Sequence, residues 1–308
     1  MSVLDKYKFL REQAKYDKLA SRNHQIFGKV LHVVPGASAT HGDWARLIKR
    51  AVYNDVNTAY ADTVSGRGDA IVVWPGAHTL TANLAVANNN VSFWGSESWI
   101  GVEAQKSASI VTPLAATDGF TVTGTDVLFR GLTIVPITAK VGITFSAAAL
   151  RLRVINCHFD MNVAVANVAT KGIIATGAAV DCLIKGNTFY SLGAHGPFMT
   201  VTGLLNYKVM ENDFIVLTGG TMANAILVGA AAQGLISKNN FFGGTLTASI
   251  DGTGATVASS CRIFDNSFGV LCTTPIKNFS AVNLADIKDN RVATVGAGTG
   301  GTLITNIS

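Results

Sequence analysis

Four charged side chains recur at one position of a repeated pattern, and their types could support acid–base chemistry. Glu211, Lys238, Asp265 and Asp289 each stand directly before an Asn. If these copies stack as neighbouring strands, Asp265 and Asp289 lie about 4.8 Å apart, close to the carboxyl separation of roughly 5 Å in retaining glycosidases. Turns also favour Asp and Asn for backbone reasons, and no aromatic sugar platform accompanies the pair. We therefore expect a structural turn here rather than a catalytic pair.

The element that positions these residues is a nine-residue pattern, seen at residues 182–190 as Cys-Leu-Ile-Lys-Gly-Asn-Thr-Phe-Tyr. Its seven copies share an apolar centre, a slot three residues later that is usually Asn, and a large apolar residue two positions beyond the slot. The centres are Phe129, Val154, Ile184, Val209, Ile236, Ile263 and Ile287, and the large apolar residues are Ile134, Phe159, Phe189, Phe214, Phe241, Phe268 and Val292. Leu132 and Cys157 fill the slot in the first two copies. The slots are 24 to 30 residues apart, a period that predicts a repeat architecture.

The spacing inside each copy indicates which repeat this is. Residues 209–211 and 263–265 alternate in the manner of strands, Gly and Asn are abundant, and helical spacing is absent between copies. The Leu-x-x-Leu-x-Leu signature of leucine-rich repeats is also missing. The copies resemble the right-handed parallel β-helix of pectate-lyase-like proteins over roughly the last two thirds of the chain.

This resemblance implies an all-β fold, a right-handed parallel β-helix solenoid with an N-terminal helical arm and a short capping helix. Strands spaced about 4.8 Å apart allow equivalent Asn side chains to hydrogen-bond to one another along the axis. We expect a structural ladder rather than a ligand site, made by Asn187, Asn212, Asn239, Asn266 and Asn290.

Three segments are expected along the chain: an N-terminal arm or anchor at 1–26, a capping strand-helix-strand segment at 27–78 and the parallel β-helix at 79–308. The arm contains helix formers and two opposed apolar faces, so we expect it to pack between two partners. The candidate particle-binding residues on the arm are Leu4, Tyr7, Leu10, Arg11, Lys15 and Lys18.

The second segment is expected to cover the first coil, which would otherwise expose strand edges and a bare core. Residues 40–43 resemble a capping box and precede a short helix with an apolar stripe of Trp44, Leu47, Ile48 and Ala51. Residues 68–76, Gly-Asp-Ala-Ile-Val-Val-Trp-Pro-Gly, resemble the first strand of phage-borne and polysaccharide-degrading β-helix proteins.

Composition limits the classes of function. The chain has 308 residues, of which 48% are hydrophobic and only 14% charged, with a net charge of +5. Residues 1–24 hold six of the 24 Lys and Arg residues, so the rest of the chain is close to neutral and no nucleic-acid groove is expected along the solenoid. Neither a signal peptide nor a membrane span is expected.

No metal or cofactor is expected either, because the sequence lacks Cys-x-x-Cys and His-rich spacings. Cys182 and Cys261 occupy the same position of the pattern three coils apart, roughly 14 Å along the axis, and therefore cannot pair. We expect buried free thiols in a protein made in a reducing host cytoplasm.

The motifs of β-helix enzymes are largely missing. Of the polygalacturonase motifs, only the Gly-His-Gly has an echo, at Ala194, His195 and Gly196, while the Asp-Asp pair and Arg-x-Lys are absent. Pectate lyases need clustered Asp for calcium and an Arg base, but the acids from Glu97 onward are sparse and separate. The sequence therefore predicts that the chain is not an enzyme.

The function expected from these features is a structural virion protein of a tailed phage, a capsid decoration protein or head fibre attached through its arm. Between residues 214 and 260 only Lys238 and Asp251 are charged, which indicates that neighbouring subunits cover part of the surface. The resemblance to viral β-helices implies that these subunits form a homotrimer. The expected partners are the major capsid protein or another virion protein, together with a surface glycan, and the expected location is the exterior of the virion. The alternatives are a tailspike-type polysaccharide depolymerase and a receptor-binding tail fibre.

Overall fold

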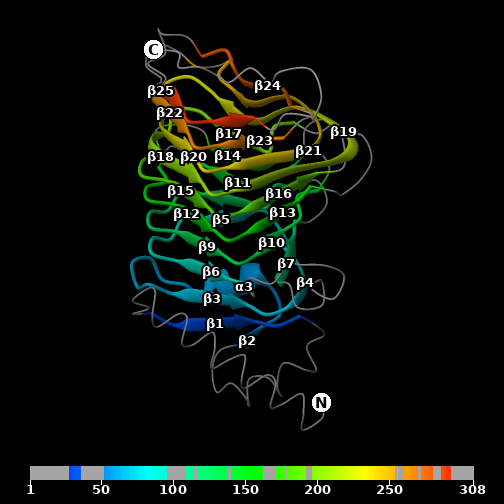
Figure 1. Cartoon of the computed structure of the whole chain (residues 1–308). Helices are drawn as coiled ribbons and strands as arrows, with labels where there is room; N and C mark the ends of the chain where they lie inside the picture. The colour runs from blue at the N-terminus through cyan, green and yellow to red at the C-terminus, as the bar shows by residue number, and fades with distance from the viewer. Residues whose placement is uncertain are drawn as a thin grey trace.

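The structure is a computed structural model. It describes residues 28–35, 52–95, 109–113, 117–137, 140–146, 148–161, 171–175, 177, 179–191, 196–253, 255, 260–269, 272–279 and 286–292. Parallel strands stack as rungs from β1 near the N-terminal end to β25 near the C-terminal end (Figure 1). The predicted parallel β-helix is confirmed.

One wall of the solenoid, which we call face A, is an 11-stranded sheet in the described part of the chain. In spatial order its strands are β2 (Val52–Tyr53), β1 (Val30–Val33), β3 (Ala70–Val73), β6 (Ser92–Trp94), β9 (Leu128–Arg130), β12 (Arg153–Ile155), β15 (Leu183–Lys185), β18 (Leu205–Met210), β20 (Gln233–Ser237), β22 (Ser260–Phe264) and β25 (Asp286–Lys288). The centres of all seven sequence copies lie in these strands and pair with one another in register.

The other two walls belong to one larger sheet. Face B consists of β4 (Gly76–Thr79), β7 (Ser109–Thr112), β10 (Thr133–Ile134), β13 (His158–Asp160), β16 (Thr188–Ser191), β23 (Ser267–Phe268), β26 (Arg291–Val292) and the first parts of two long strands, β19 (Asp213–Val228) and β21 (Asn240–Asp251). Face C consists of β5 (Leu84–Val86), β8 (Phe120–Val122), β11 (Val141–Phe145), β14 (Lys171–Ala175), β17 (Met199–Val201), β24 (Cys272–Lys277) and the later parts of β19 and β21.

The two long strands join faces B and C into one sheet. β19 pairs with β16 through Asp213–Val216 and with β17 through residues 226–228. In Figure 1, β19 and β21 follow a wide curve on one side of the stack. The coils from β3 to β24 therefore contribute to all three walls, and the interior is closed on three sides.

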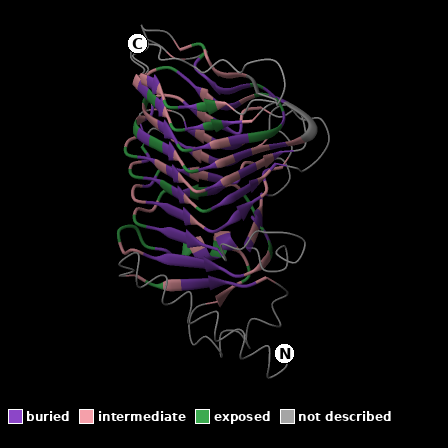
Figure 2. Cartoon of the chain, viewed as in Figure 1, coloured by how far each residue is buried: buried purple, intermediate pink, exposed green. Residues whose placement is uncertain are grey.

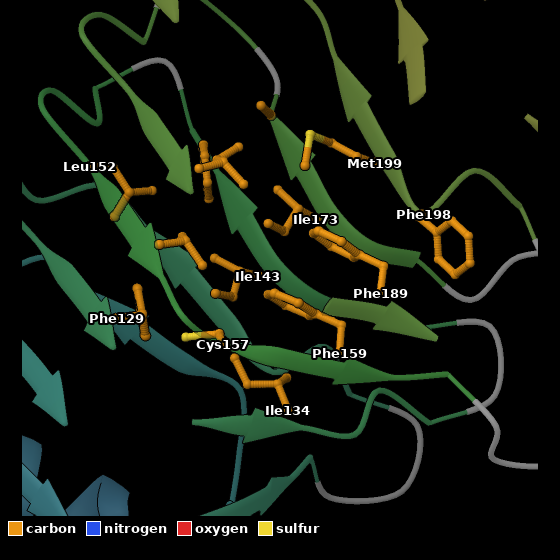
Figure 3. Packing of buried hydrophobic residues seen from close by; sticks show 14 of the residues in the cluster. Phe129, Ile134, Ile143, Leu152, Cys157, Phe159, Ile173, Phe189, Phe198 and Met199 are labelled. Atoms are coloured by element: carbon orange, nitrogen blue, oxygen red, sulfur yellow. The ribbon is translucent and has the colours of Figure 1, made fainter. Parts of the chain in front are cut away.

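Phenylalanine stacks fill the interior along face B. The rings of Phe159, Phe189, Phe214, Phe241 and Phe268 form one column with successive centroid separations of 4.7, 4.9, 4.9 and 5.1 Å. All five side chains are fully buried. Figure 3 shows Phe159 and Phe189 stacked within this core, with Cys157 and Ile143 nearby. In Figure 2, buried residues (purple) follow the strands along the described stack, and partly buried (pink) and exposed (green) residues lie mostly at its edges.

A short helix, α3 (Val56–Ala61), packs near the N-terminal coils. Its N-cap is Asp55, whose carboxylate accepts a hydrogen bond from the Thr58 amide at 2.8 Å. Val56 and Ala59 are fully buried. The helix that the sequence predicts after residue 43 lies outside the described residues, as do residues 1–26 of the predicted arm.

Face A continues across residue 79, where the sequence suggests a boundary between a capping segment and the solenoid. β1 pairs with β3 over four residues, and β3 pairs with β6. Asp69, just before β3, accepts hydrogen bonds from the amides of Lys29 and Val64 and from the side chain of Arg67. These bonds attach β1 and the segment after α3 to the start of β3.

Candidate functional site

Each coil places two neighbouring residues in the turn between faces A and B, and the second of them points inward. The amide oxygen of Asn239 accepts hydrogen bonds from the backbone and side-chain nitrogens of Asn212 at 3.0 and 2.9 Å. Its own Nδ2 donates to the carbonyl of Val209 and to Asn266 Oδ1, both at 3.0 Å. The same arrangement links the five residues Asn187, Asn212, Asn239, Asn266 and Asn290, all at most 4% exposed.

This ladder begins where the sequence pattern changes. The backbone amide of Cys157 donates to Asn187 Oδ1 at 2.8 Å, but a thiol cannot accept and donate as an amide does. Because the Asn side chains use their hydrogen-bonding groups on one another and on the turn backbone, they have a structural task and are enclosed in the wall.

The residue just before each Asn slot points outward and adopts a left-handed backbone. The φ values are +58° at Glu211, +56° at Lys238, +56° at Asp265 and +54° at Asp289, and Asn156, Gly131 and Gly186 share this conformation in the earlier copies. Gly, Asn and Asp tolerate it best. Backbone conformation therefore accounts for Asp265 and Asp289, the two acids whose spacing suggested a glycosidase pair.

The surroundings of Asp265 and Asp289 are mostly ion pairs and strands. Both side chains are exposed at neighbouring turns. On the adjacent strands, Asp286 pairs with Arg262 at 3.5 Å and with Lys288 at 3.6 Å. Arg262 also lies over the ring of Phe264, 5.6 Å from its centroid. Among the described residues, these charged groups pair with one another and not with Asp265 or Asp289.

His195 and the six arm residues lie outside the described part of the chain. Cys157, Cys182 and Cys261 are buried and form no disulfide, as expected. Burial raises the pKa of the Cys182 thiol to about 11 and that of Cys261 to about 12. Within the described residues, no group of three or more His, Cys, Asp or Glu side chains is placed to hold a metal ion.

A better candidate for ligand contact lies on the outside of face B. Phe242 in β21 is 41% exposed, and only one other large hydrophobic side chain in the described residues, Val64, is as accessible. Phe242 is in register with Ile215 of β19, which is in register with Tyr190 of β16. Aromatic and aliphatic side chains therefore form an outer row across three neighbouring strands.

A polar row runs beside this apolar row. Asn240 of β21 is in register with Asp213 of β19, and its Nδ2 donates to Asp213 Oδ1 at 2.8 Å. Asn240 stands two residues before Phe242, a distance of about 6.6 Å along a parallel strand. We call Tyr190, Asp213, Ile215, Asn240 and Phe242 the face B site. Its parts could hold a ligand that has both an apolar side and hydroxyl groups.

His158 lies in the same polar row, one coil before Thr188 and two before Asp213. Its side chain is only 4% exposed although its position faces outward. Burial lowers the pKa of the His158 imidazole from 6.5 to about 4, so the ring is neutral at pH 7. It lies 6.2 Å from the ring of Tyr190 and supports the N-terminal edge of the face B site.

Sequence reasoning missed this site although a signal was present. Phe241 and Phe242 are adjacent in a strand, where successive side chains point to opposite faces. Since Phe241 belongs to the inward column of the pattern, Phe242 has to point outward. A comparison of repeat copies discards such a residue because the other copies do not share it.

Comparisons with known proteins place the fold but not the activity. No protein-family model matches the sequence, and no curated protein matches it either. Similar solved structures include the pectate lyase Pel9A, with 13% identity and a TM-score of 0.36 over 86% of this chain and 80% of that one. Another is a DFA-IIIase mutant from Arthrobacter chlorophenolicus A6 in complex with DFA-III, with 14% identity and a TM-score of 0.32 over 77% of this chain and 81% of that one. A third is a tailspike protein mutant of E. coli bacteriophage HK620 in complex with a pentasaccharide, with 12% identity and a TM-score of 0.29 over 80% of this chain and 65% of that one.

One expectation changes after these comparisons. The similar structures are right-handed parallel β-helices, and they include enzymes as well as a phage protein. Missing motifs led to the prediction that the chain is not an enzyme. That prediction is wrong, because a pectate lyase and a DFA-IIIase are among the structures similar to this chain. No helix in the described residues has the length and apolar character needed to cross a membrane.

Proposed function

We propose that the protein binds a surface glycan through face B, as a receptor-binding protein of the tailspike type on the exterior of a phage tail. The observation that carries this proposal is the exposed Phe242 ring beside the hydrogen-bonded pair of Asp213 and Asn240. A sugar ring presents C–H groups on its faces and hydroxyl groups at its edge. An aromatic ring next to a carboxylate and an amide matches both.

The face B site rests on rigid elements. Behind Phe242 and Ile215 stand Phe241 and Phe214, whose rings stack at 4.9 Å in the core. The Asn ladder fixes the turn that precedes each of these strands. A site whose backbone is already ordered loses little conformational freedom on binding, so shallow contacts can give measurable affinity.

This function is favoured over capsid decoration by the chemistry of the site. A decoration protein needs a surface that fits a capsid. That need does not explain an exposed aromatic ring beside a carboxylate–amide pair. Attachment to the particle is proposed for residues 1–26, where the candidate binding residues lie.

A homotrimer is proposed as the assembly, packed through face C. The outer column of that face has no charged residue over five successive strands, and its members are only partly exposed: Thr121, Thr144, Ile174, Thr200 and Leu227. This uncharged stretch, which ends where Asp251 and Lys277 pair with each other in the same column, is suited to contact with copies of itself. Leu227→Lys is expected to convert the trimer to a monomer in sedimentation velocity, and a wild-type monomer would contradict the assembly.

The function is tested by binding of the full-length protein to an array of bacterial surface glycans. Phe242→Ala and Asp213→Ala are each expected to weaken binding at least about tenfold, which corresponds to about 1.4 kcal/mol. Val64→Ala is the matched control, because Val64 is 49% exposed but lies outside the face B site. The proposal fails if no glycan is bound, or if Phe242→Ala and Val64→Ala bind equally well. Release of reducing ends from a bound polysaccharide would add cleavage to binding.

A further inference from the structure

We infer that the glycan recognised on face B is uncharged. This inference rests on the proposed function and narrows it to one class of ligand, sugar chains without carboxylate, sulfate or phosphate groups. Three independent distributions of charge support it.

The first is the outer surface of face B itself. In the described residues from β7 to β23, the outward positions contain two ionised groups, Asp160 and Asp213, and both are acids. His158 is neutral because of its burial. A cation first appears at Arg291 in β26, two coils beyond Asn240. At the outward positions of these strands, an anionic sugar near Phe242 would therefore meet a carboxylate and no Lys or Arg.

The second distribution is the contrast with face A. Its outward strand positions hold five cations against one acid, Asp286, between β12 and β25; the cations are Arg153, Lys185, Lys208, Arg262 and Lys288. The chain thus carries cations on outward strand positions, but on a different wall from the exposed aromatic ring. These cations lie on the wall before the turn, and the exposed aromatic ring lies on the wall after it.

The third is the sequence of the segments that follow β13, β16, β19 and β21. Residues 162–170 and 192–195 contain no Lys or Arg, and between residues 214 and 260 the sole cation is Lys238. Lys238 is exposed in the turn between faces A and B, two residues before Asn240. Whatever conformation residues 162–170 and 192–195 adopt, they supply no cation to the site.

These charge distributions make binding at the face B site selective for uncharged sugars. A carboxylate leaving water needs a cationic or multiple N–H partner, and the ionised side chain of the face B site, Asp213, repels it. An uncharged sugar meets no such cost, because its hydroxyl groups can donate to the carboxylate of Asp213 and bond to the amide of Asn240. The site therefore accepts hydroxyl-rich neutral sugars and rejects their uronic or sialylated counterparts.

The test uses matched pairs of polysaccharides, an acidic polymer and its carboxyl-reduced form, added to the full-length protein at low and at physiological salt. The wild-type protein is expected to bind the neutral member at least tenfold more tightly, with an affinity that hardly changes with salt. Asp213→Asn is expected to narrow this difference by removing the repulsion. Asp213→Lys is expected to reverse the preference, and thermal unfolding of both variants shows that they remain folded.

Each outcome decides between the two levels of the proposal. Phe242-dependent binding that is equal or tighter for acidic polymers would overturn the inference of a neutral glycan and leave glycan binding standing. Binding of neither member, in any pair of the panel, would overturn glycan binding on face B and this inference together. Selective, salt-insensitive binding of the neutral members supports both.

Discussion

Phe241 and Phe242 are neighbours in β21, yet one is fully buried and the other is 41% exposed. The inner ring stacks between Phe214 and Phe268 at 4.9 and 5.1 Å. The outer ring extends a row that includes Ile215 and Tyr190. The alternation of a strand assigns one residue to the fold and the next to the solvent, so stability and recognition can be changed separately.

The same division appears in the turns. In each copy, an outward residue with a left-handed backbone precedes an inward residue at the Asn slot. The outward position accepts Gly, Asn, Asp, Glu or Lys, whereas the inward position is Asn in five successive copies. A buried hydrogen-bonding position restricts residue type far more than an exposed one, because an unpaired buried group is costly.

The largest expected effect concerns the inner row. Phe241→Ala should lower the free energy of unfolding by about 3 to 5 kcal/mol, because it removes a ring stacked on both sides in a closed core. Denaturant titration measures this loss. Phe242→Ala serves as the control, and equal losses for the two variants would break the comparison between the rows.

The next effect concerns the ladder. Asn239→Leu should cost about 3 kcal/mol, because the side chain of Asn239 accepts from Asn212 and donates to Val209 and Asn266. Asn240→Ala, one residue along and partly exposed, should cost under about 1 kcal/mol. Indistinguishable midpoints for the two variants in thermal unfolding would show that the ladder does not stabilise the coil.

A pH effect of similar size comes from the outward but buried His158. Its folded pKa of about 4 lies below its ordinary value of 6.5, so the unfolded chain takes up the proton first as the pH falls. The free energy of unfolding should therefore fall between pH 6.5 and pH 4, by up to about 3 kcal/mol from this residue. His158→Gln should flatten that part of the profile, and an unchanged slope in the variant would contradict burial of the ring.

A smaller, stabilising effect is expected in the outward turn. Lys238 has a φ of +56°, which Asn adopts more readily than Lys. Lys238→Asn should raise the free energy of unfolding by up to about 1 kcal/mol. Lys208, an exposed residue of strand β18, is the control, and Lys208→Asn should bring no gain. Matching gains in both variants would point to charge rather than backbone conformation.

The repeated pattern was sufficient to predict the β-helix, its strands from Phe129 onward and the placement of the five Asn residues in successive turns. Burial explains this success, because inward positions must satisfy the same packing and hydrogen bonding in every coil. The earlier strands β1, β3 and β6 belong to the same wall, but the repeated pattern does not include them because they lack the Asn slot. Their inward residues, Ile71 and Phe93, continue the column of Phe129.

The face B site could not be predicted in the same way. Solvent accepts almost any side chain at an outward position, so neither Asp213 nor Phe242 is required by the fold. Its rows form only when strands far apart in sequence come into register, as Thr188, Asp213 and Asn240 do. The repeat comparison directed attention to Asp265 and Asp289, whose common feature is backbone conformation.

The most direct test of the central claim measures unfolding and glycan binding together on Phe242→Ala. The account predicts a free energy of unfolding within about 1 kcal/mol of the wild-type value and at least a tenfold loss of affinity for the bound glycan. A variant that binds as well as the wild-type protein, or one that loses binding only because it unfolds, would contradict the separation of recognition from stability on this strand.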